Sequence, residues 1–360
     1  MRSSSCTLSI LAIGCLLVSG AAGAADSQPD GRLAYVSNLM SHTVSVIDLG
    51  SRRWIRDLEL GRYPVYSSLD PHDPAKLILA LHNYERTESD DAIVRVDRAS
   101  GRILDTVPFP GAGMPSGFVY DAKRDRFYVA DENLHRIFAL DGTTLAPLFD
   151  LPAGLIPIHV DVSPDGRWLV ATNRKSANLY VYDLDDEAHG AKDGIYTIPL
   201  GRAPGLHWDA DTPDAEPSSH PLDLKFSGDS RTVWVTDSGA MQLLAVDILA
   251  GRIVGRVTLD LPPFDMTLNH DRSLAYICHV TGDAITVVDL KKMAVASVIE
   301  GLSPNPIHCA LDEEDGLLVA AGWGADRAGG VHLIDLKTLK LLETIRPEGA
   351  RGSIGITIGP

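Results

Sequence analysis

The chain has 360 residues, of which 22% are charged, and a formal net charge of −16 at pH 7. Such an excess of carboxylates repels phosphate backbones and anionic lipid, which excludes nucleic acid and membrane surfaces as preferred partners. The length suffices for one large domain with an ample core.

The first residues have the pattern of an export signal. Arg2 precedes an apolar stretch over residues 8–18 that is too short to span a bilayer, and Ala22-Gly23-Ala24 supplies a cleavage site of the A-x-A type. No later segment reaches eighteen uninterrupted apolar residues. We therefore expect residues 1–24 to be a signal peptide and residues 25–360 to be a single periplasmic or secreted domain without a membrane span. A closed ring of the kind predicted below needs no second subunit, so a monomer is expected.

One β-rich unit recurs along the chain. Its clearest copy is Tyr35-Val36-Ser37-Asn38 followed by residues 43–49, and alternating Val, Ile, Tyr and Thr suit pleated, buried strands. Each copy closes on an aspartate that begins a turn, and the intervals between these aspartates lie between 42 and 64 residues: Asp48, Asp97, Asp141, Asp183, Asp247, Asp289 and Asp335. Seven copies predict an all-β, seven-bladed β-propeller of four-stranded blades.

The two ends of the chain predict how the ring closes. Residues 33–60 supply three strands of the first blade but lack the Pro-led innermost strand of the other copies. The tail, residues 352–358, has the pattern of that missing strand. We expect the C-terminal strand to complete blade 1, which leaves few open sheet edges.

The motifs Tyr35-Val36-Ser37-Asn38, Tyr128-Val129-Ala130-Asp131 and Trp234-Val235-Thr236-Asp237 carry a family resemblance. With them the chain resembles the YVTN-repeat (YncE-like) propellers, which include periplasmic proteins and archaeal surface-layer proteins. The resemblance implies the propeller fold for essentially the whole mature chain. It implies little about function, because propellers host many unrelated activities.

The copies differ most informatively on their innermost strands. Two residues after each leading proline, and at the matching position of the tail, stand Tyr66, Gly117, His159, Asp223, Asp265, His308 and Gly355. Four consecutive blades thus present His, Asp, Asp and His at one level of the channel. These are ligands of Zn, Cu or Fe and also the usual acid/base groups, so His159, Asp223, Asp265 and His308 are predicted as a metal site. Polar lining of a water-filled channel and a metal-free catalytic or substrate-binding set are the alternatives.

Further polar residues are expected on the same face and are predicted to bind a ligand. Tyr66 shares the level of the column, His82 and His279 end second strands, and His220 precedes Pro221. An insertion over residues 201–219, acidic and containing Trp208, enters on that face and has the character of a lid or partner surface.

Two cysteines remain after removal of the signal, Cys278 beside His279 and Cys309 beside His308. Their blades are neighbours, so a disulfide, two buried free thiols, and thiolate ligation of a metal are the three interpretations.

No haem-attachment CxxCH, Gly-rich phosphate loop or GxSxG elbow occurs. The first hypothesis is therefore a non-catalytic propeller that binds a small ligand, a metal or a partner protein at its His/Asp-rich channel mouth. The second is a metal- or quinone-linked oxidoreductase, because the chain is similar to the propellers of quinoprotein amine dehydrogenase heavy chains, nitrous oxide reductase and cytochrome d1. The third is a metal-dependent, lactonase-type hydrolase, which an all-oxygen site would fit better.

Overall fold

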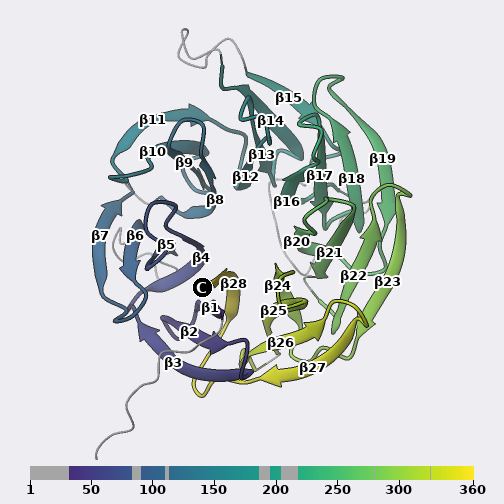
Figure 1. The fold of residues 1–360 in the computed structure, drawn as a ribbon. Helices are drawn as coiled ribbons and strands as arrows, with labels where there is room; N and C mark the ends of the chain where they lie inside the picture. Colours follow the sequence, from purple (N-terminus) through teal and green to yellow (C-terminus); the bar gives the residue numbers. More distant parts are fainter. Residues whose placement is uncertain are drawn as a thin grey trace, which may run out of the picture. The chain divides into compact units, whose positions relative to one another are not determined.

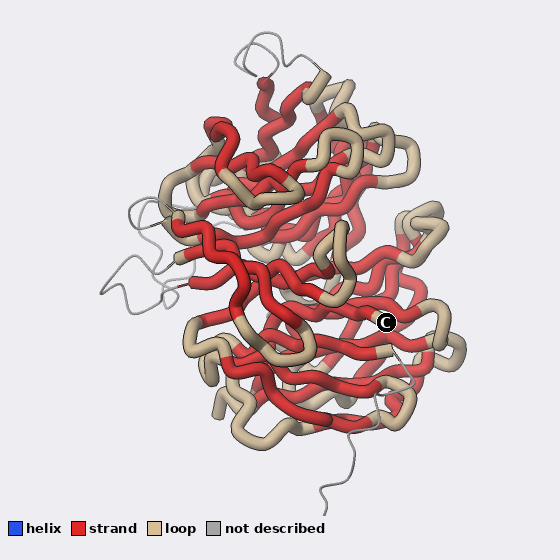
Figure 2. The backbone as a smooth tube through the Cα atoms, turned by 60° about the vertical axis from the view of Figure 1, so that its left-hand side comes forward, coloured by secondary structure: helices blue, strands red, loops and turns tan. Residues whose placement is uncertain are grey.

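In a computed structural model of the protein, the described residues are 32–82, 91–109, 113–185, 195–203, 218–279, 281–324 and 326–360. They form seven four-stranded antiparallel sheets arranged as blades around a central channel (Figure 1). Within these ranges every regular element is a strand, as the tube view also shows (Figure 2). The predicted all-β, seven-bladed propeller is confirmed. Nothing in the described ranges has the length and apolar character of a membrane-spanning helix. The predicted signal peptide lies outside the described residues.

Each blade runs from the channel to the rim. The innermost strands are β4 (Tyr63–Leu69), β8 (Pro115–Asp121), β12 (Pro157–Val162), β16 (Pro221–Phe226), β20 (Pro263–Leu268), β24 (Pro306–Asp312) and β28 (Ser353–Gly359). The second strands are β1 (Leu33–Asn38), β5 (Lys76–His82), β9 (Arg126–Asp131), β13 (Trp168–Asn173), β17 (Thr232–Asp237), β21 (Leu274–His279) and β25 (Leu317–Trp323). The third strands are β2 (Thr43–Asp48), β6 (Ala92–Asp97), β10 (Arg136–Asp141), β14 (Asn178–Asp183), β18 (Gln242–Asp247), β22 (Ala284–Asp289) and β26 (Gly329–Asp335). The outer strands are β3 (Arg53–Glu59), β7 (Ile103–Pro108), β11 (Pro147–Pro152), β15 (Ile195–Pro199), β19 (Arg252–Thr258), β23 (Ala294–Glu300) and β27 (Lys340–Ile345).

The ring closes as the sequence predicts. Blade 1 has the strand order β28-β1-β2-β3, so the C-terminal strand is its innermost strand. In the antiparallel register of β28 and β1, Leu33 faces Gly359 and Tyr35 faces Thr357. The hydroxyls of Ser67 and Thr357, 2.7 Å apart, then join this strand to blade 2. Both ends of the domain are thereby fixed inside the sheet.

Apolar side chains of adjacent blades form the core. Between blades 4 and 5, for example, Val170 and Val181 pack in one buried cluster with Leu224, Phe226 and Val235. Because a single twisted sheet cannot bury both faces, each blade depends on its neighbours for this burial. The interlocked ring holds the innermost strands at a fixed spacing around the channel.

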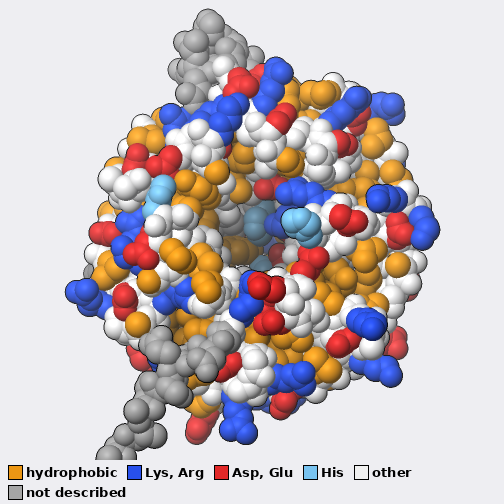
Figure 3. Space-filling view, viewed as in Figure 1, with side chains coloured by type: hydrophobic (Ala, Val, Ile, Leu, Met, Phe, Trp, Pro, Cys, Tyr) orange, Lys and Arg blue, Asp and Glu red, His pale blue; other side chains and the backbone are white. Residues whose placement is uncertain are grey.

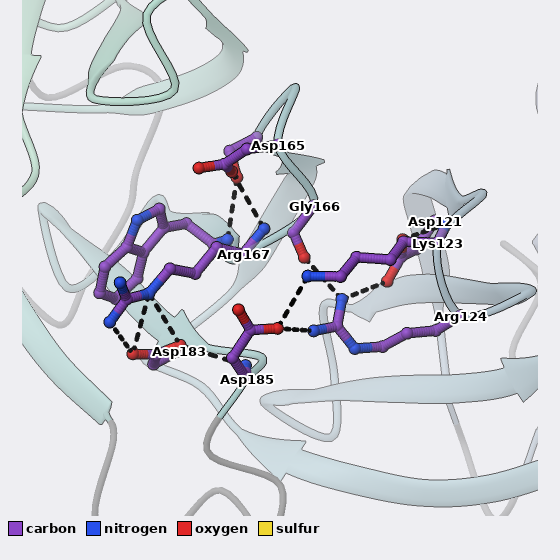
Figure 4. A network of polar contacts seen from close by, with 10 residues as sticks. Asp121, Lys123, Arg124, Asp165, Gly166, Arg167, Asp183 and Asp185 are labelled. Carbon is purple, nitrogen blue, oxygen red and sulfur yellow. Dashed lines mark hydrogen bonds and ion pairs between the residues drawn. The ribbon is translucent and has the colours of Figure 1, made fainter.

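A polar network ties blades 3 and 4 at the rim (Figure 4). Asp185, which follows β14, pairs with Lys123 at 2.9 Å and Arg124 at 2.5 Å from the turn after β8. Arg124 also donates to the backbone carbonyl of Gly166 at 2.6 Å. Asp185, whose side chain is about half exposed, thus links two blades. Exposed pairs of this kind add little stability, so the network mainly fixes geometry.

Candidate functional site

A repeated bulge positions the channel side chains. In β12, Pro157 pairs with Asn173 but Val160 pairs with Ala171, so the register shifts between the proline and the third residue after it. A one-residue shift occurs at the same place in β4, β8, β16 and β20, and in β24 it lies between Pro306 and His308. A bulge bends the strand and re-aims one side chain. The re-aimed residue is the one two positions after each proline, the level selected from the sequence.

Threonines of the second strands support this bulge in blades 4 and 5. The Thr172 hydroxyl accepts a hydrogen bond from the His159 backbone N–H at 3.2 Å and donates to the Leu222 carbonyl of the next blade at 2.7 Å. Thr236 does the same for Asp223 at 2.9 Å and Phe264 at 3.0 Å. Each threonine thus fixes one ring residue and one neighbouring strand.

The structure brings the predicted column together as two His–Asp pairs across blade boundaries. Nδ1 of His159 in blade 4 lies 3.5 Å from Oδ1 of Asp223 in blade 5. Nδ1 of His308 in blade 7 lies 3.5 Å from Oδ1 of Asp265 in blade 6. All four side chains are buried. A carboxylate beside Nδ1 holds the ring proton there and leaves Nε2 for a further partner.

Tyr66 fills the space between the two pairs. Its ring meets the His159 ring edge-on at a centroid distance of 4.9 Å and the His308 ring at 5.3 Å. Phe264 meets the His308 ring at 5.2 Å. Beside Leu222 and Phe264, the space between Tyr66 and the two histidines is too small for a water molecule. Tyr66 therefore narrows the channel at the level of the histidines.

Two glycines of the column leave room for their neighbours. A Cβ on Gly117 would lie 2.4 Å from Cδ2 of His159, so the imidazole occupies the space that a side chain would take. A Cβ on Gly355 would lie 2.2 Å from the carbonyl oxygen of Val65, and Gly355 has a positive φ of 70°. Only glycine meets both demands at that position.

The carboxylates are already heavily engaged. Oδ1 of Asp223 accepts from Leu224 N–H at 2.8 Å and from Lys225 Nζ at 3.1 Å, while Oδ2 accepts from Met266 N–H at 2.9 Å. Oδ2 of Asp265 accepts from Cys309 N–H at 3.0 Å. Across the described ranges, no three His, Cys, Asp or Glu side chains are grouped so that they could hold a metal ion. The ammonium of Lys225 beside Asp223 also opposes a metal cation electrostatically.

A second polar level lies two residues further along the innermost strands. It includes Ser68, Asp161, Lys225 and Thr267, none of which was selected from the sequence. Asp161 Oδ2 accepts from Phe226 N–H at 2.8 Å and so joins blades 4 and 5. Repeating the proline alignment two positions later would have found this level.

These two levels enclose a cavity of about 260 Å³. Its lining combines ring residues with the second level and with apolar groups: Tyr66, Ser68, Phe118, His159, Lys225, Asp265, Met266, Thr267, His308 and Ala310 among them. The lining residues stand two to four positions after the prolines, so the cavity extends from the level of the histidines toward the C-terminal ends of the innermost strands. On one face of the molecule the centre is visibly hollowed, with histidine, carboxylate and Lys or Arg surface in and around it (Figure 3).

Burial and neighbouring charges set the protonation states of the titratable side chains around the cavity. It lowers the pKa of His159 to about 4, although Asp223 works in the opposite direction. Burial acts to raise the pKa of Asp265, but the adjacent His308 and the Lys225 ammonium outweigh it and lower this pKa to about 2. Burial also opposes the charge on Lys225, yet Asp223, Asp161 and Asp265 together raise its pKa. At neutral pH His159 is a neutral base and Asp265 an anion.

One nitrogen atom of the two His–Asp pairs has no hydrogen-bond partner within the described part of the chain. Nε2 of His308 is buried and unpaired, although only 4% of the residue is exposed and the side chain lines the cavity. The hydroxyl oxygen of Ser68, in the same lining, is likewise buried and unpaired among the described residues. Unsatisfied buried groups are rare in folded proteins and concentrate at functional sites.

His82 and His279 are not brought to this ring. Both end second strands, where the other blades carry Asn38, Asp131, Asn173, Asp237 and Trp323. Asp237, for example, accepts from the His220 N–H at 2.7 Å. Nε2 of His82 instead contacts the carbonyl of Pro115, and Nε2 of His279 lies 2.8 Å from the Thr286 hydroxyl. Burial lowers the pKa of each to about 4, which suits structural, neutral imidazoles.

His220, the 201–219 insertion and the two cysteines are the remaining predicted groups, and of these Cys309 lines the cavity. The ring of His220 is 2.9 Å from the Ser218 hydroxyl, before the innermost strand of blade 5. Most of the 201–219 insertion falls outside the described residues. Cys278 and Cys309 are both buried and free, and burial raises the pKa of both thiols. Cys309 Sγ lies 3.4 Å from the Tyr276 carbonyl.

Comparison with known proteins gives a distant relative. No family model matches the chain. It is 24% identical over 351 residues to dihydro-heme d1 dehydrogenase of Pseudomonas aeruginosa, covering 92% of this chain and 64% of that protein. A solved structure of dihydro-heme d1 dehydrogenase NirN in complex with DHE aligns with a TM-score of 0.61 at 18% identity, covering 90% of this chain and 74% of that one. A functionally unknown protein from Desulfotomaculum acetoxidans aligns with a TM-score of 0.68 at 10% identity, covering 91% and 99%. These likenesses to solved structures concern the fold.

Proposed function

We propose that this protein is an exported, periplasmic propeller that binds a small organic molecule in the channel cavity, beside two His–Asp pairs. The observation that carries the proposal is the His308 side chain: it lines the cavity, its Nδ1 faces Asp265, and its Nε2 is buried with no hydrogen-bond partner among the described residues. Export rests on the signal pattern of residues 1–24.

The size of the cavity limits the ligand. Sites for drug-sized ligands measure roughly 300–1,000 Å³. The cavity of about 260 Å³ falls just below that range, which favours a molecule smaller than a typical drug. Tyr66, Phe118 and Met266 offer it apolar contact, and the histidines offer hydrogen bonds or proton exchange.

The test begins with protein exported to the periplasm by its own leader and purified without an affinity tag. Small molecules released by denaturation are identified by mass spectrometry, and a small-molecule library is screened in parallel by ligand-observed NMR. Ala310→Phe, which fills the cavity, is the matched control. We expect a compound that binds the wild type and not the filled variant. A wild-type protein that neither carries nor binds any small molecule more than the variant does would contradict the proposal.

The second candidate is an oxidoreductase acting on a tetrapyrrole. It is favoured by the similarity to a dihydro-heme d1 dehydrogenase, of which the chain spans 64%. A macrocycle exceeds the cavity, so this candidate requires binding on the rim of the channel rather than in it. Titration with haem-type compounds, followed by their absorption bands, tests it: a saturable spectral change that Ala310→Phe does not abolish would favour this candidate over the first.

A further inference from the structure

We infer that the ligand of the channel cavity carries a carboxylate, which hydrogen-bonds to the ammonium of Lys225. The inference rests on the proposed ligand site and adds the chemical class that this site selects. Neither the sequence nor the comparisons point to Lys225.

The hydrogen-bond donors around the cavity are in surplus. An ammonium has three donors, and within the described ranges Lys225 Nζ donates only to Asp223, at 3.1 Å. About a third of its side chain is exposed, and it lines the cavity. The hydroxyl of Ser68, which has no hydrogen-bond partner among the described residues, and the hydroxyl of Thr267 add two more donors in the same lining.

The acceptors are largely consumed by the protein itself. Asp223 receives Leu224 N–H, Lys225 Nζ and Met266 N–H, and His159 lies beside it. An ionised carboxylate offers about four acceptor positions, so at most one, on Oδ2, is left on Asp223. Asp265, the carboxylate of the cavity lining, receives Cys309 N–H on Oδ2 at 3.0 Å, and its Oδ1 lies 3.5 Å from His308 Nδ1. Asp161 receives Val162 N–H at 3.0 Å and Phe226 N–H at 2.8 Å, and its carboxylate links two strands.

A ligand that complements spare donors must bring acceptor oxygens. A carboxylate does so with a charge that matches the ammonium, and charge-assisted hydrogen bonds are about twice as strong as neutral ones. An organic cation would meet Lys225 as a like charge and an organic anion would meet Asp265 as one, so the spare donors of Lys225 decide in favour of the anion. The apolar remainder of a short-chain acid fits against Tyr66, Phe118 and Met266.

The experiment is a ligand-observed NMR titration with acetate and propionate, using acetamide and methylammonium as probes of nearly the same size. We expect the two acids to bind and methylammonium not to bind. Lys225→Met should weaken acid binding roughly 10- to 100-fold, the usual loss for a hydrogen bond to a charged group. Lys225→Arg should retain most of the binding.

Two further variants keep the test decisive. Removing the Lys225 charge leaves Asp223 buried without its cation, so the double variant Lys225→Met/Asp223→Asn serves where the single one does not fold. Ser68→Ala should weaken binding, whereas Ser67→Ala should not, because the Ser67 hydroxyl already pairs with Thr357 at 2.7 Å.

The outcomes separate the two proposals. Binding of methylammonium that tightens in Lys225→Met would overturn the carboxylate and leave the ligand site standing. Binding of acetamide and acetate with equal affinity would overturn the role of charge. Failure of every probe, together with no released or screened compound in the preceding experiment, would sink the ligand site itself.

Discussion

Gly117→Ala should dislodge His159 from the ring. The new Cβ would lie 2.4 Å from Cδ2 and 2.8 Å from Nε2 of His159. Carbon atoms in contact stay about 3.5 Å apart or more, so the imidazole must retreat by about 1 Å. Its neighbours at the ring, Asp223 at 3.5 Å and the Tyr66 ring at 4.9 Å, then lose their present geometry.

The displacement has two measurable effects. Overpacking of this kind costs about 1–3 kcal/mol of the free energy of unfolding, read from urea denaturation. The pKa of His159, held at about 4 by burial, should rise toward the ordinary histidine value as the ring gains water. Imidazole nitrogen NMR over a pH titration reports this pKa directly.

Gly228→Ala is the matched control, because a Cβ there meets nothing within 4 Å and the backbone needs no positive φ. It should leave both readouts as in the wild type. If Gly117→Ala also left the His159 pKa near 4 and the unfolding free energy within about 0.5 kcal/mol of wild type, the packing account of the ring would be refuted.

Three other predictions concern stability and metal content. Burial lowers the pKa of His82, His159 and His279 to about 4, whereas histidines of the unfolded chain titrate near 6.5. Between these two pH values the unfolded state binds more protons than the folded state. The free energy of unfolding should therefore fall as pH drops through this window, by up to about 3 kcal/mol for each histidine. Urea unfolding at several pH values checks this, and His82→Asn should flatten the slope; a flat wild-type profile would contradict it. Thr172→Val should cost about 1–3 kcal/mol in the same assay because it removes the hydroxyl shared by His159 and Leu222, and Thr172→Ser should recover most of it; equal stability of all three would count against the bulge support. Untagged protein analysed by elemental mass spectrometry should carry no stoichiometric Cu, Zn or Fe, whereas a full equivalent that is lost in His159→Ala and His308→Ala would restore the predicted metal site.

The fold could be predicted because one pattern of strands and turns repeats along the sequence. Alternating β-branched residues, the recurrent turn aspartates and the Pro-led strands each repeat seven times or nearly so, and the tail supplies the one missing strand. The proline alignment also selected side chains that meet at one level of the channel, because the register shifts within three residues of each leading proline.

The chemistry of the site was less accessible from the sequence. The alignment gives a level but no pairing across blades, so the coupling of His159 with Asp223 and of His308 with Asp265 required coordinates. Lys225 was missed because its level carries no repeated residue type. His82 and His279 were both selected as histidines. His279 stands where other copies carry a loop-capping Asn or Asp, a signal that the repeat itself contains.

The packing of Tyr66 determines on which side of the histidine level the cavity lies. Tyr66 occupies the centre of the ring, and the larger space opens toward the second polar level. From the sequence, a tyrosine at this column position indicates only that the channel is narrowed there. Its orientation against two imidazoles depends on Gly117 and Gly355, which make room for its neighbours.

The most direct test of the account is a crystal structure of the protein soaked with a mixture of small acids, amides and amines. The account predicts a bound fragment in the cavity between Tyr66 and Lys225, within hydrogen-bond distance of Lys225 or His308, and its absence in Ala310→Phe crystals. Fragments bound only elsewhere, with the wild-type channel holding water alone, would contradict it.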